Sequence, residues 1–363
     1  MDRALDQGIA EIVRGQVPGL SAAIVRPEGT VMTIGLGIAD LRSSTPATPN
    51  TIYPWFSMTK LVTATCVMQP VERGQLDLDG PVSTHYPAIL DLRPRRWAEA
   101  VTIRTLLNHT AGLVNPMPIA WIHMANEPAP DPDKFLMGLL VKSRRLRAAP
   151  GSTAVYSNLG YLVLGRIVVH AAGQSYQDYV RNHVLAPLGM KSTDFIVRDD
   201  MAPLAATGYQ KRWNMMTPLF HLLLPRDVMG RREGGFIALN RFYVDGDAYG
   251  GLIGSVVDAA RFLQAHLSGS GGGVRLLSSK SVELMRALTA HGAKLDVGLG
   301  WYRHHSSPRG DFVEHWGGGG GFFAAMRLYP AAGFGLVMIG NATRFDHQSI
   351  LDRLAGRAQH GDL

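Results

Sequence analysis

The hydrophobic pattern near the start of the chain predicts a surface helix followed by two strands. Apolar runs at 20–25 ("LSAAIV") and 30–39 ("TVMTIGLGIA") stand on either side of the turn sequence "RPEG". Runs of this composition around a Pro/Gly turn predict a β-hairpin. Over residues 1–16, apolar residues such as Ile9 and Val13 recur at helical spacing among charges. This pattern predicts an amphipathic helix, and it lacks the apolar core of a signal peptide.

Helical patterns dominate the middle of the chain, from Ser57 to about residue 200. Four segments there combine helical spacing of apolar residues with a final glycine, which is typical of helix ends: 58–74, 102–112, 159–173 and 176–189. Pro70 lies inside the first of them. We therefore expect that helix to kink or to end early at this proline.

Strand patterns return late in the chain. Two apolar runs, 322–329 and 333–340, are joined by a Pro/Gly turn, and a helical pattern follows over 346–358. Strands near both ends with helices between them predict a mixed α/β (α+β) fold. We expect a central antiparallel sheet built from both chain termini and flanked by helices, with a mostly helical inserted domain. The expected boundaries are 1–54 with 205–363 for the sheet domain and 55–204 for the helical domain.

The composition describes a soluble globular protein and excludes several classes. Hydrophobic residues make up 46% and charged residues 18% of the 363 residues. No apolar stretch is long enough to span a bilayer, so the cytoplasm is the default location. Cys66 is the single cysteine, which excludes an internal disulfide, and its apolar neighbours predict a buried side chain. The histidines show no zinc-binding spacing, so we expect no metal and no cofactor.

The net charge of +7 and the pI of about 9.6 would suit an anionic partner. The arginines, however, are spread along the chain. Two short basic clusters, "RPRR" at 93–96 and "KSRR" at 142–145, are typical of solvated surface. We therefore expect no nucleic-acid partner.

The stretch "FSMTK" at 56–60 carries the first candidate chemistry. Residues three apart share one face of a helix, so Ser57 and Lys60 can touch. A serine hydroxyl becomes a good nucleophile only when a base lies within hydrogen-bond reach. If Ser57 is the first residue of the helix, its free N–H and the positive end of the helix dipole would stabilise an oxyanion. The same positive end, together with burial, would lower the pKa of Lys60. Alone, Ser-x-x-Lys is common and usually structural, but it occurs once here, after the aromatic lead-in "IYPWF".

Two later stretches offer partners for this pair. In "YSN", extended geometry would point Tyr156 and Asn158 to the same side. A tyrosine can act as a general base beside a cation, and an amide both donates and accepts, although this stretch is also typical of a plain loop before a helix. In "EHWGGGGGFF", consecutive glycines leave N–H groups open for an oxyanion hole, or form only a flexible turn. The G-x-S-x-G signature is absent, which argues against an α/β-hydrolase.

In this order, the three stretches resemble the serine β-lactamase-like family, which joins penicillin-binding proteins, class C β-lactamases and related esterases of the family VIII carboxylesterase type. Four further passages resemble its recurring pattern: "VPGLSAAIV", "LDLDGPVSTHYP", "LLNHTAGL" and "YGGLIGSVVDAARF". The similarity covers roughly residues 17–342. It implies a sheet domain and a mostly helical domain with the active site between them.

The resemblance also implies roles for individual residues. Ser57 matches the acylated nucleophile, Lys60 its proton partner, and Tyr156 the residue that passes protons to and from the serine and the leaving group. Asn158 matches the amide that orients the lysine and the substrate. The oxyanion hole would consist of the N–H of Ser57 and that of Gly318.

Three segments carry other expectations. In "LLNHTAGL", we expect Asn108 and His109 to hold a loop and to take no part in chemistry. The segments 113–128 and 212–229 are unusually apolar. They could line the cleft and accommodate apolar substrate groups, or pack on the body of the protein.

The third motif departs from the family pattern. Lactamases and peptidases of the family usually carry Lys-Thr-Gly or Lys-Ser-Gly where this chain has His315, Trp316 and Gly317, which we expect to bind substrate. A neutral imidazole and an indole do not suit the carboxylate that β-lactams and D-alanyl peptides present beside the scissile bond. We therefore predict a serine carboxylesterase that acts on small uncharged esters. A β-lactamase or D-amino-acid peptidase, an acyltransferase and a non-catalytic binding protein are the alternatives.

Overall fold

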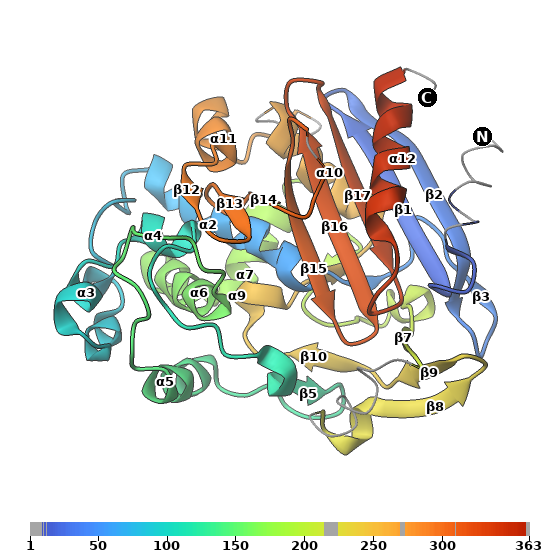
Figure 1. The fold of residues 1–363 in the computed structure, drawn as a ribbon, viewed down its shortest axis with the longest axis horizontal. Coiled ribbons are helices and arrows are strands. Elements are labelled where there is room, and N and C mark those ends of the chain that lie inside the picture. The colour runs from blue at the N-terminus through green and yellow to red at the C-terminus, as the bar shows by residue number, and fades with distance from the viewer. Residues whose placement is uncertain are drawn as a thin grey trace.

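The structure is a computed structural model and describes residues 9, 11, 13–213, 224–268, 273–308 and 310–360. These residues form one large antiparallel sheet of nine strands in the order β12-β13-β14-β15-β16-β17-β1-β2-β3 (Figure 1). The strands are β1 (Gly19–Arg26), β2 (Gly29–Asp40), β3 (Thr45–Pro46), β12 (Ala290–His291), β13 (Leu295–Val297), β14 (Tyr302–His304), β15 (Val313–Gly319), β16 (Phe322–Tyr329) and β17 (Phe334–Gly340).

Strand β1 is an interior strand of this sheet, the seventh of nine, and both of its faces are covered. It pairs with β2 on one edge and with β17 on the other. Helix α10 (Val256–Ser268) covers one face, and α12 (His347–His360) packs on the opposite face (Figure 1). A strand covered on both faces carries a continuous apolar run, and all residues of β1 except the last are buried. The predicted antiparallel sheet from both ends of the chain, its first hairpin and its last helix are therefore confirmed.

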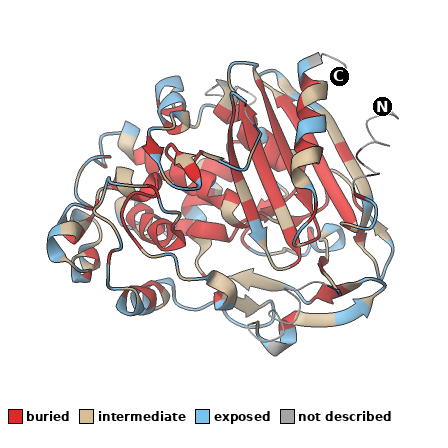
Figure 2. Ribbon diagram, viewed as in Figure 1, coloured by how far each residue is buried: buried red, intermediate tan, exposed pale blue. Residues whose placement is uncertain are grey.

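The helical part packs beside the sheet around α2 and α6, which are the most deeply buried helices there (Figure 2). Its helices are α2 (Thr59–Glu72), α3 (Arg95–Glu99), α4 (Ile103–Leu107), α5 (Pro132–Lys142), α6 (Asn158–Ala172), α7 (Tyr176–Val180), α9 (Asp247–Gly250) and α11 (Ser279–Arg286). Helix α2 continues through Pro70 and ends two residues later. Cys66 is buried within it, as predicted.

Two predicted helices are shorter than their patterns. Helix α4 covers only the start of 102–112, because the chain leaves the helix at Asn108 and His109 adopts a φ of +61°. The segment 176–189 forms α7 and then a π-helical turn over Arg181–Leu185. Most of the helix expected over 1–16 lies outside the described residues, as does part of 212–229.

Three small sheets connect distant parts of the chain. One joins β4 (Tyr53–Pro54), β11 (Ile253–Gly254) and β6 (Thr193–Asp194), and another joins β5 (Ile122–Met124) to β10 (Phe242–Val244). The third joins β7 (Gly208–Lys211), β9 (Phe236–Leu239) and β8 (Met229–Glu233). In the described ranges, no helix combines the length and the hydrophobicity needed to cross a membrane.

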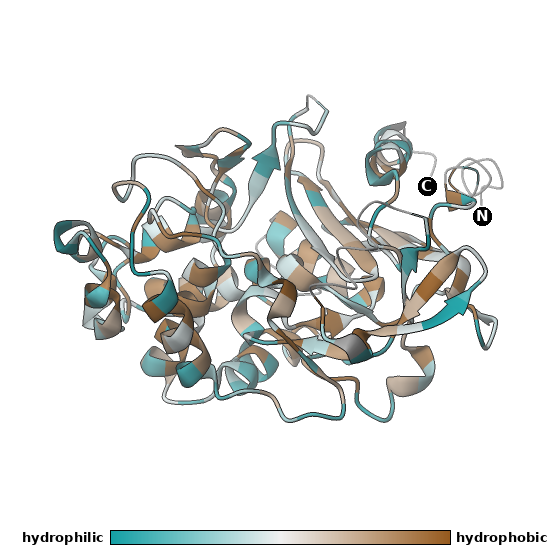
Figure 3. Ribbon diagram, turned by 60° about the horizontal axis from the view of Figure 1, so that its bottom comes forward, coloured by the Kyte–Doolittle hydropathy of each residue, from teal (hydrophilic) through white to brown (hydrophobic). Residues whose placement is uncertain are grey.

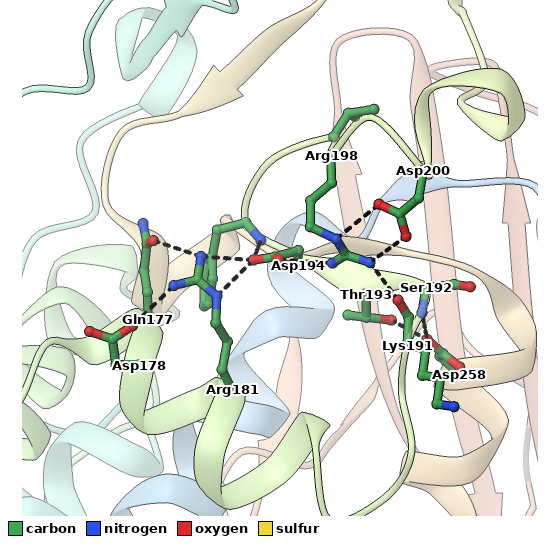
Figure 4. A network of polar contacts seen from close by, with 12 residues as sticks. Gln177, Asp178, Arg181, Lys191, Ser192, Thr193, Asp194, Arg198, Asp200 and Asp258 are labelled. Atoms are coloured by element: carbon green, nitrogen blue, oxygen red, sulfur yellow. Dashed lines mark hydrogen bonds and ion pairs between the residues drawn. The ribbon is translucent and has the colours of Figure 1, made fainter.

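A polar network fixes the first of these sheets beside α7 and α10 (Figure 4). Asp194, in β6, accepts hydrogen bonds from Arg181 at 2.9 Å and from Arg198 at 2.8 Å. Asp258, in α10, accepts a hydrogen bond from the backbone N–H of Ser192 at 2.7 Å. The network thereby holds β6 next to β11 and β4, and the chain runs from β4 directly into the turn that bears the candidate nucleophile.

Candidate active site

Ser57 lies in a single 3₁₀ turn, Phe56–Met58, directly before α2. Phe56 has a φ of +45°, which is strained for a residue with a Cβ. Packing of its ring stabilises this conformation, because the ring lies 6.5 Å from those of Phe242 and Phe322. A Cβ at Gly319 would stand 2.4 Å from the same ring, so this position accepts only glycine. The sharp turn therefore results from tertiary contacts around Phe56.

Lys60 points from α2 to the hydroxyl of Ser57. Its Nζ lies 3.0 Å from Oγ of Ser57 and 2.7 Å from the carbonyl oxygen of Tyr249. The lysine is fully buried, and this burial lowers its pKa well below 10.5. Burial therefore favours the unprotonated amine, which can accept the proton of the serine.

Tyr156 completes this group from the loop before α6. It forms a hydrogen bond with Ser57, and Nζ of Lys60 lies 4.9 Å from the centre of its ring. Burial raises the pKa of Tyr156 above its usual value, while the hydrogen bond with Ser57 lowers it by less. The tyrosine is thus a neutral phenol that can donate a hydrogen bond to Oγ.

His109 clamps the loop on both sides of Tyr156. The carbonyl oxygen of His109 accepts a hydrogen bond from the N–H of Val155 at 2.9 Å, and its Nδ1 accepts one from the N–H of Ser157 at 3.2 Å. Its ring also packs on the Tyr156 ring, with centroids 4.5 Å apart. His109 therefore does hold a loop, as predicted, and the loop it holds carries Tyr156.

Two buried and neutral histidines, His109 and His315, flank the cluster formed by Ser57, Lys60 and Tyr156. Burial lowers the pKa of His315 to about 3, and burial is also the largest cause of the lowered pKa of His109. Nδ1 of His315 donates to the carbonyl oxygen of Gly300 at 2.7 Å, so its Nε2 is an acceptor. Nδ1 of His109 is an acceptor, so its Nε2 carries the proton. Neither Nε2 has a hydrogen-bond partner among the described residues.

The structure places Trp316 away from this cluster. Successive residues of a strand point to opposite faces, and His315 takes the face of β15 toward Tyr156. Trp316 points to the α12 face, where its ring stacks on His304 at 4.8 Å and meets His347 edge-on at 5.2 Å. Of the two side chains of the third motif that were expected to bind substrate, that of His315 lies beside Tyr156 and that of Trp316 points to the opposite face.

The glycines of β15 let this strand approach the turn that carries Ser57. A Cβ at Gly317 would lie 2.0 Å from the carbonyl oxygen of Trp55. Beyond Glu314 no described strand pairs with the outer edge of β15, and the N–H of Trp316 on that edge donates to Oη of Tyr302 at 2.7 Å. Backbone groups two residues apart point the same way, so the N–H of Gly318 is directed outward at the same edge.

Asn158 opens α6 beside the cluster. Its N–H donates to Oδ1 of Asn115 at 3.0 Å, and its own Oδ1 is buried without a partner among the described residues. Among the described residues, no hydrogen bond joins Asn158 to Lys60. The amide oxygen is therefore available to accept a hydrogen bond from a bound molecule.

A cavity of about 450 Å³ brings most of these groups to one surface. Ser57, Tyr156, Asn158 and Gly318 are among its lining residues. The remaining wall is largely apolar and includes Pro118, Ile119, Ile122, Leu224, Phe242, Val244 and Tyr249. Four of these, Pro118, Ile119, Ile122 and Leu224, come from the two apolar segments considered above. No cluster of described residues could hold a metal ion.

A family model described as Beta-lactamase matches residues 1–359. The chain belongs to the beta-lactamase family. Within this family of serine hydrolases, it is 28% identical over 283 residues to the putative penicillin-binding protein PbpX of Bacillus subtilis (strain 168). That match covers 78% of this chain and 61% of the relative, so the chain spans less than two thirds of the relative's length.

Solved structures of beta-lactamase-family proteins share the fold. The octameric penicillin-binding protein homologue from Pyrococcus abyssi matches with a TM-score of 0.77 and 25% identity, over 99% of this chain and 78% of that one. The D-amino acid amidase from Ochrobactrum anthropi SV3 complexed with L-phenylalanine matches with a TM-score of 0.81 and 24% identity, over the whole of both chains. The resemblance inferred from the motifs is therefore confirmed for the family and the fold.

Two contributors to this beta-lactamase-family site were not expected from the sequence. Tyr249 offers a backbone oxygen to Lys60, and no sequence signal marks a backbone contact. Asn115 anchors the start of α6 through its side chain. It lies within the apolar segment 113–128, where an amide among apolar residues was the only signal available.

Proposed function

We propose that this beta-lactamase-family protein hydrolyses uncharged carboxylic esters through an acyl-enzyme on Ser57. The observation that carries the proposal is the 3.0 Å contact between Nζ of Lys60 and Oγ of Ser57, together with the burial that lowers the lysine pKa. An unprotonated amine at this distance can take the hydroxyl proton as Oγ attacks the ester carbonyl. The new C–O bond produces a tetrahedral oxyanion.

The proton then returns through Tyr156. Once Lys60 is protonated, its charge stands 4.9 Å from the tyrosine ring and favours transfer from the phenol to the leaving alcohol. The alcohol departs with the proton of Tyr156, and Lys60 then passes the proton taken from Ser57 to the tyrosine, so that both residues return to their starting forms. In the second half, a water molecule attacks the acyl-enzyme and the same two residues carry its proton to Oγ.

Two backbone N–H groups suit the oxyanion in this proposal. The N–H of Ser57 precedes the hydrogen-bond ladder of α2, and the N–H of Gly318 is directed outward from the open edge of β15. Both residues line the same cavity. Such fixed donors typically contribute about 10²–10³-fold to turnover each.

The chemistry of the cavity supports an uncharged substrate. Apolar side chains form most of its wall, and none of its described lining residues carries a cationic side chain. His315 takes the place of the family lysine, and burial lowers its pKa to about 3, so it is neutral at physiological pH. A buried carboxylate would meet no charged donor here, whereas an ester requires none.

A second candidate is the hydrolysis of neutral amides, which Asn158 favours. Its buried Oδ1 lacks a partner among the described residues and would accept an N–H from an amino or amide group next to the scissile bond. Simple alkyl esters offer no such donor. The structural likeness to a D-amino acid amidase is compatible with this candidate.

A substrate panel tests the proposal and separates the two candidates. The panel contains p-nitrophenyl butyrate, D-phenylalanine amide and a chromogenic cephalosporin, each with wild type and Ser57→Ala. We expect the highest kcat/KM for the butyrate ester, loss of all activity in Ser57→Ala, and an acyl adduct on Ser57 by mass spectrometry. Faster turnover of the amide would favour the second candidate, and efficient turnover of the cephalosporin would contradict both.

A further inference from the structure

Two basic segments that are separate in the sequence lie side by side in the fold. The N–H of Arg93 donates to the carbonyl oxygen of Arg144 at 2.7 Å, and the N–H of Leu146 donates to the carbonyl oxygen of Arg93 at 2.8 Å. The clusters 93–96 and 142–145 therefore form one surface, at the end of the molecule where α3 shows hydrophilic ribbon (Figure 3). We call the residues Arg93, Arg95, Arg96, Lys142, Arg144, Arg145 and Arg147 the basic surface.

Most of the charge on the basic surface is not neutralised by the protein. Lys142, Arg144, Arg145 and Arg147 are exposed, and none forms an ion pair or a side-chain hydrogen bond with another described residue. Within the basic surface, Arg95 is the only residue with an acidic partner among the described residues, Glu99 at 3.0 Å. Adjacent uncompensated cations repel one another, and an anionic partner would relieve that repulsion.

The basic surface borders a groove with exposed apolar residues at its rim. The groove has a volume of about 530 Å³, and its lining residues are Val114, Asn115, Pro116, Lys142, Ser143, Arg144, Arg145 and Arg147. Met117, next to Pro116, is 71% exposed, and Val141, next to Lys142, is 52% exposed. Cations next to exposed aliphatic side chains are typical of surfaces that bind the interface of an anionic bilayer.

The same groove lies next to the candidate active site. Oδ1 of Asn115, in the groove wall, accepts the hydrogen bond from the N–H of Asn158 at the start of α6. Two residues beyond the groove, Pro118 and Ile119 line the apolar cavity. Met117 thus connects the rim of the groove to the rim of the cavity.

We propose that the basic surface and Met117 dock this protein onto an anionic lipid bilayer, with the mouth of the apolar cavity beside the bilayer surface. Lipid headgroups would meet the arginines, and the side chains of Met117 and Val141 would enter the interfacial layer. A single-stranded nucleic acid fits this surface less well than a bilayer does, because its bases stack on exposed aromatic rings. The exposed apolar residues described at the rim, Met117 and Val141, carry no aromatic ring. The docking does not depend on the proposed ester hydrolysis.

Vesicle co-sedimentation of the full chain tests the docking. The vesicles contain phosphatidylcholine alone or phosphatidylcholine with phosphatidylglycerol, at low and high salt. We expect binding only to the vesicles with phosphatidylglycerol, and weaker binding at high salt because the charges are screened. Equal binding to both vesicles, or no binding to either, would overturn the proposal. A stronger affinity for single-stranded RNA in a competition assay would overturn it as well.

Charge-matched variants locate the contact. Arg144→Gln, Arg145→Gln and Arg147→Gln together should weaken binding to anionic vesicles by about 10²-fold. The control replaces three exposed arginines elsewhere, Arg42, Arg231 and Arg232, by glutamine, with the same change in net charge. An equal loss in the control would show that net charge alone is responsible and would refute the assigned surface. If the first variant failed to fold by circular dichroism, Met117→Ser would replace it, with weaker binding expected and unchanged binding as the refuting outcome.

Discussion

Replacing Gly317 by alanine tests whether the contact between β15 and the turn Phe56–Met58 sets the position of Ser57. A Cβ at Gly317 would lie 2.0 Å from O of Trp55, 3.1 Å from its carbonyl carbon and 3.3 Å from N of Met58. Ordinary contacts of a Cβ begin at 3.4 Å, so strand and turn would have to separate by about 1.4 Å along the shortest contact. A displacement of about 1 Å at a reacting group typically costs about 10²-fold in rate. We therefore expect kcat/KM of Gly317→Ala to fall by about 10²-fold or more.

The assay is hydrolysis of p-nitrophenyl butyrate, with thermal unfolding measured on the same samples. Gly318→Ala is the matched control, because among the described residues its Cβ would meet Phe323 alone, at 3.6 Å, and the backbone N–H is retained. We expect a far smaller loss in the control. Wild-type kcat in a folded Gly317→Ala variant, or equal losses in the two variants, would refute the argument that close packing at Gly317 places the nucleophile.

Three further predictions concern the groups around Ser57. Tyr156→Phe keeps the ring but removes the proton carrier, so kcat should fall about 10²–10⁴-fold with the fold intact by circular dichroism; near-normal turnover would leave Lys60 as the only proton carrier. His109→Asn supplies an acceptor for the N–H of Ser157 and tolerates a positive φ, so it should retain more kcat than His109→Phe, which keeps only the ring; equal activities would count against the clamp. Burial lowers the pKa of Lys60 in the folded chain, whereas the lysine of the unfolded chain keeps a pKa of about 10.5. Between these two pKa values the unfolded chain binds one proton more than the folded chain, so the free energy of unfolding rises with pH over this range. Lys60→Met should flatten this rise in urea unfolding measured from neutral to alkaline pH, and an unchanged slope would contradict the burial of a neutral amine.

Local patterns predicted much of the fold because its main elements carry strong periodic signals. The contact between Lys60 and Ser57 could be predicted from the sequence, because residues three apart share one face of a helical turn. The clamp on Tyr156 could not be anticipated in this way, because His109 and Ser157 are 48 residues apart and meet only in the folded chain.

The different positions of His315 and Trp316 have a simple physical origin. His315 and Trp316 are consecutive residues of a strand, so their side chains point to opposite faces and only one of them can face a given cleft. The two basic clusters also show what a linear sequence hides, since backbone pairing between Arg93 and Arg144 makes one surface of them. The division into domains at residues 54 and 205 and the catalytic roles stay predictions.

The position of β1 has a consequence for how this protein is made in the cell. One edge of β1 is completed only by β17, and Asn341, which accepts the hydrogen bond from the N–H of Gly19, is 322 residues away. At translation rates of about 5–20 residues per second, the first hairpin waits roughly 15–60 s with an apolar strand edge unpaired. A nascent chain in that state is a natural client for ribosome-associated chaperones. The turn that carries Ser57 is also unsupported in that state, since β15, which packs against it, emerges more than 250 residues later.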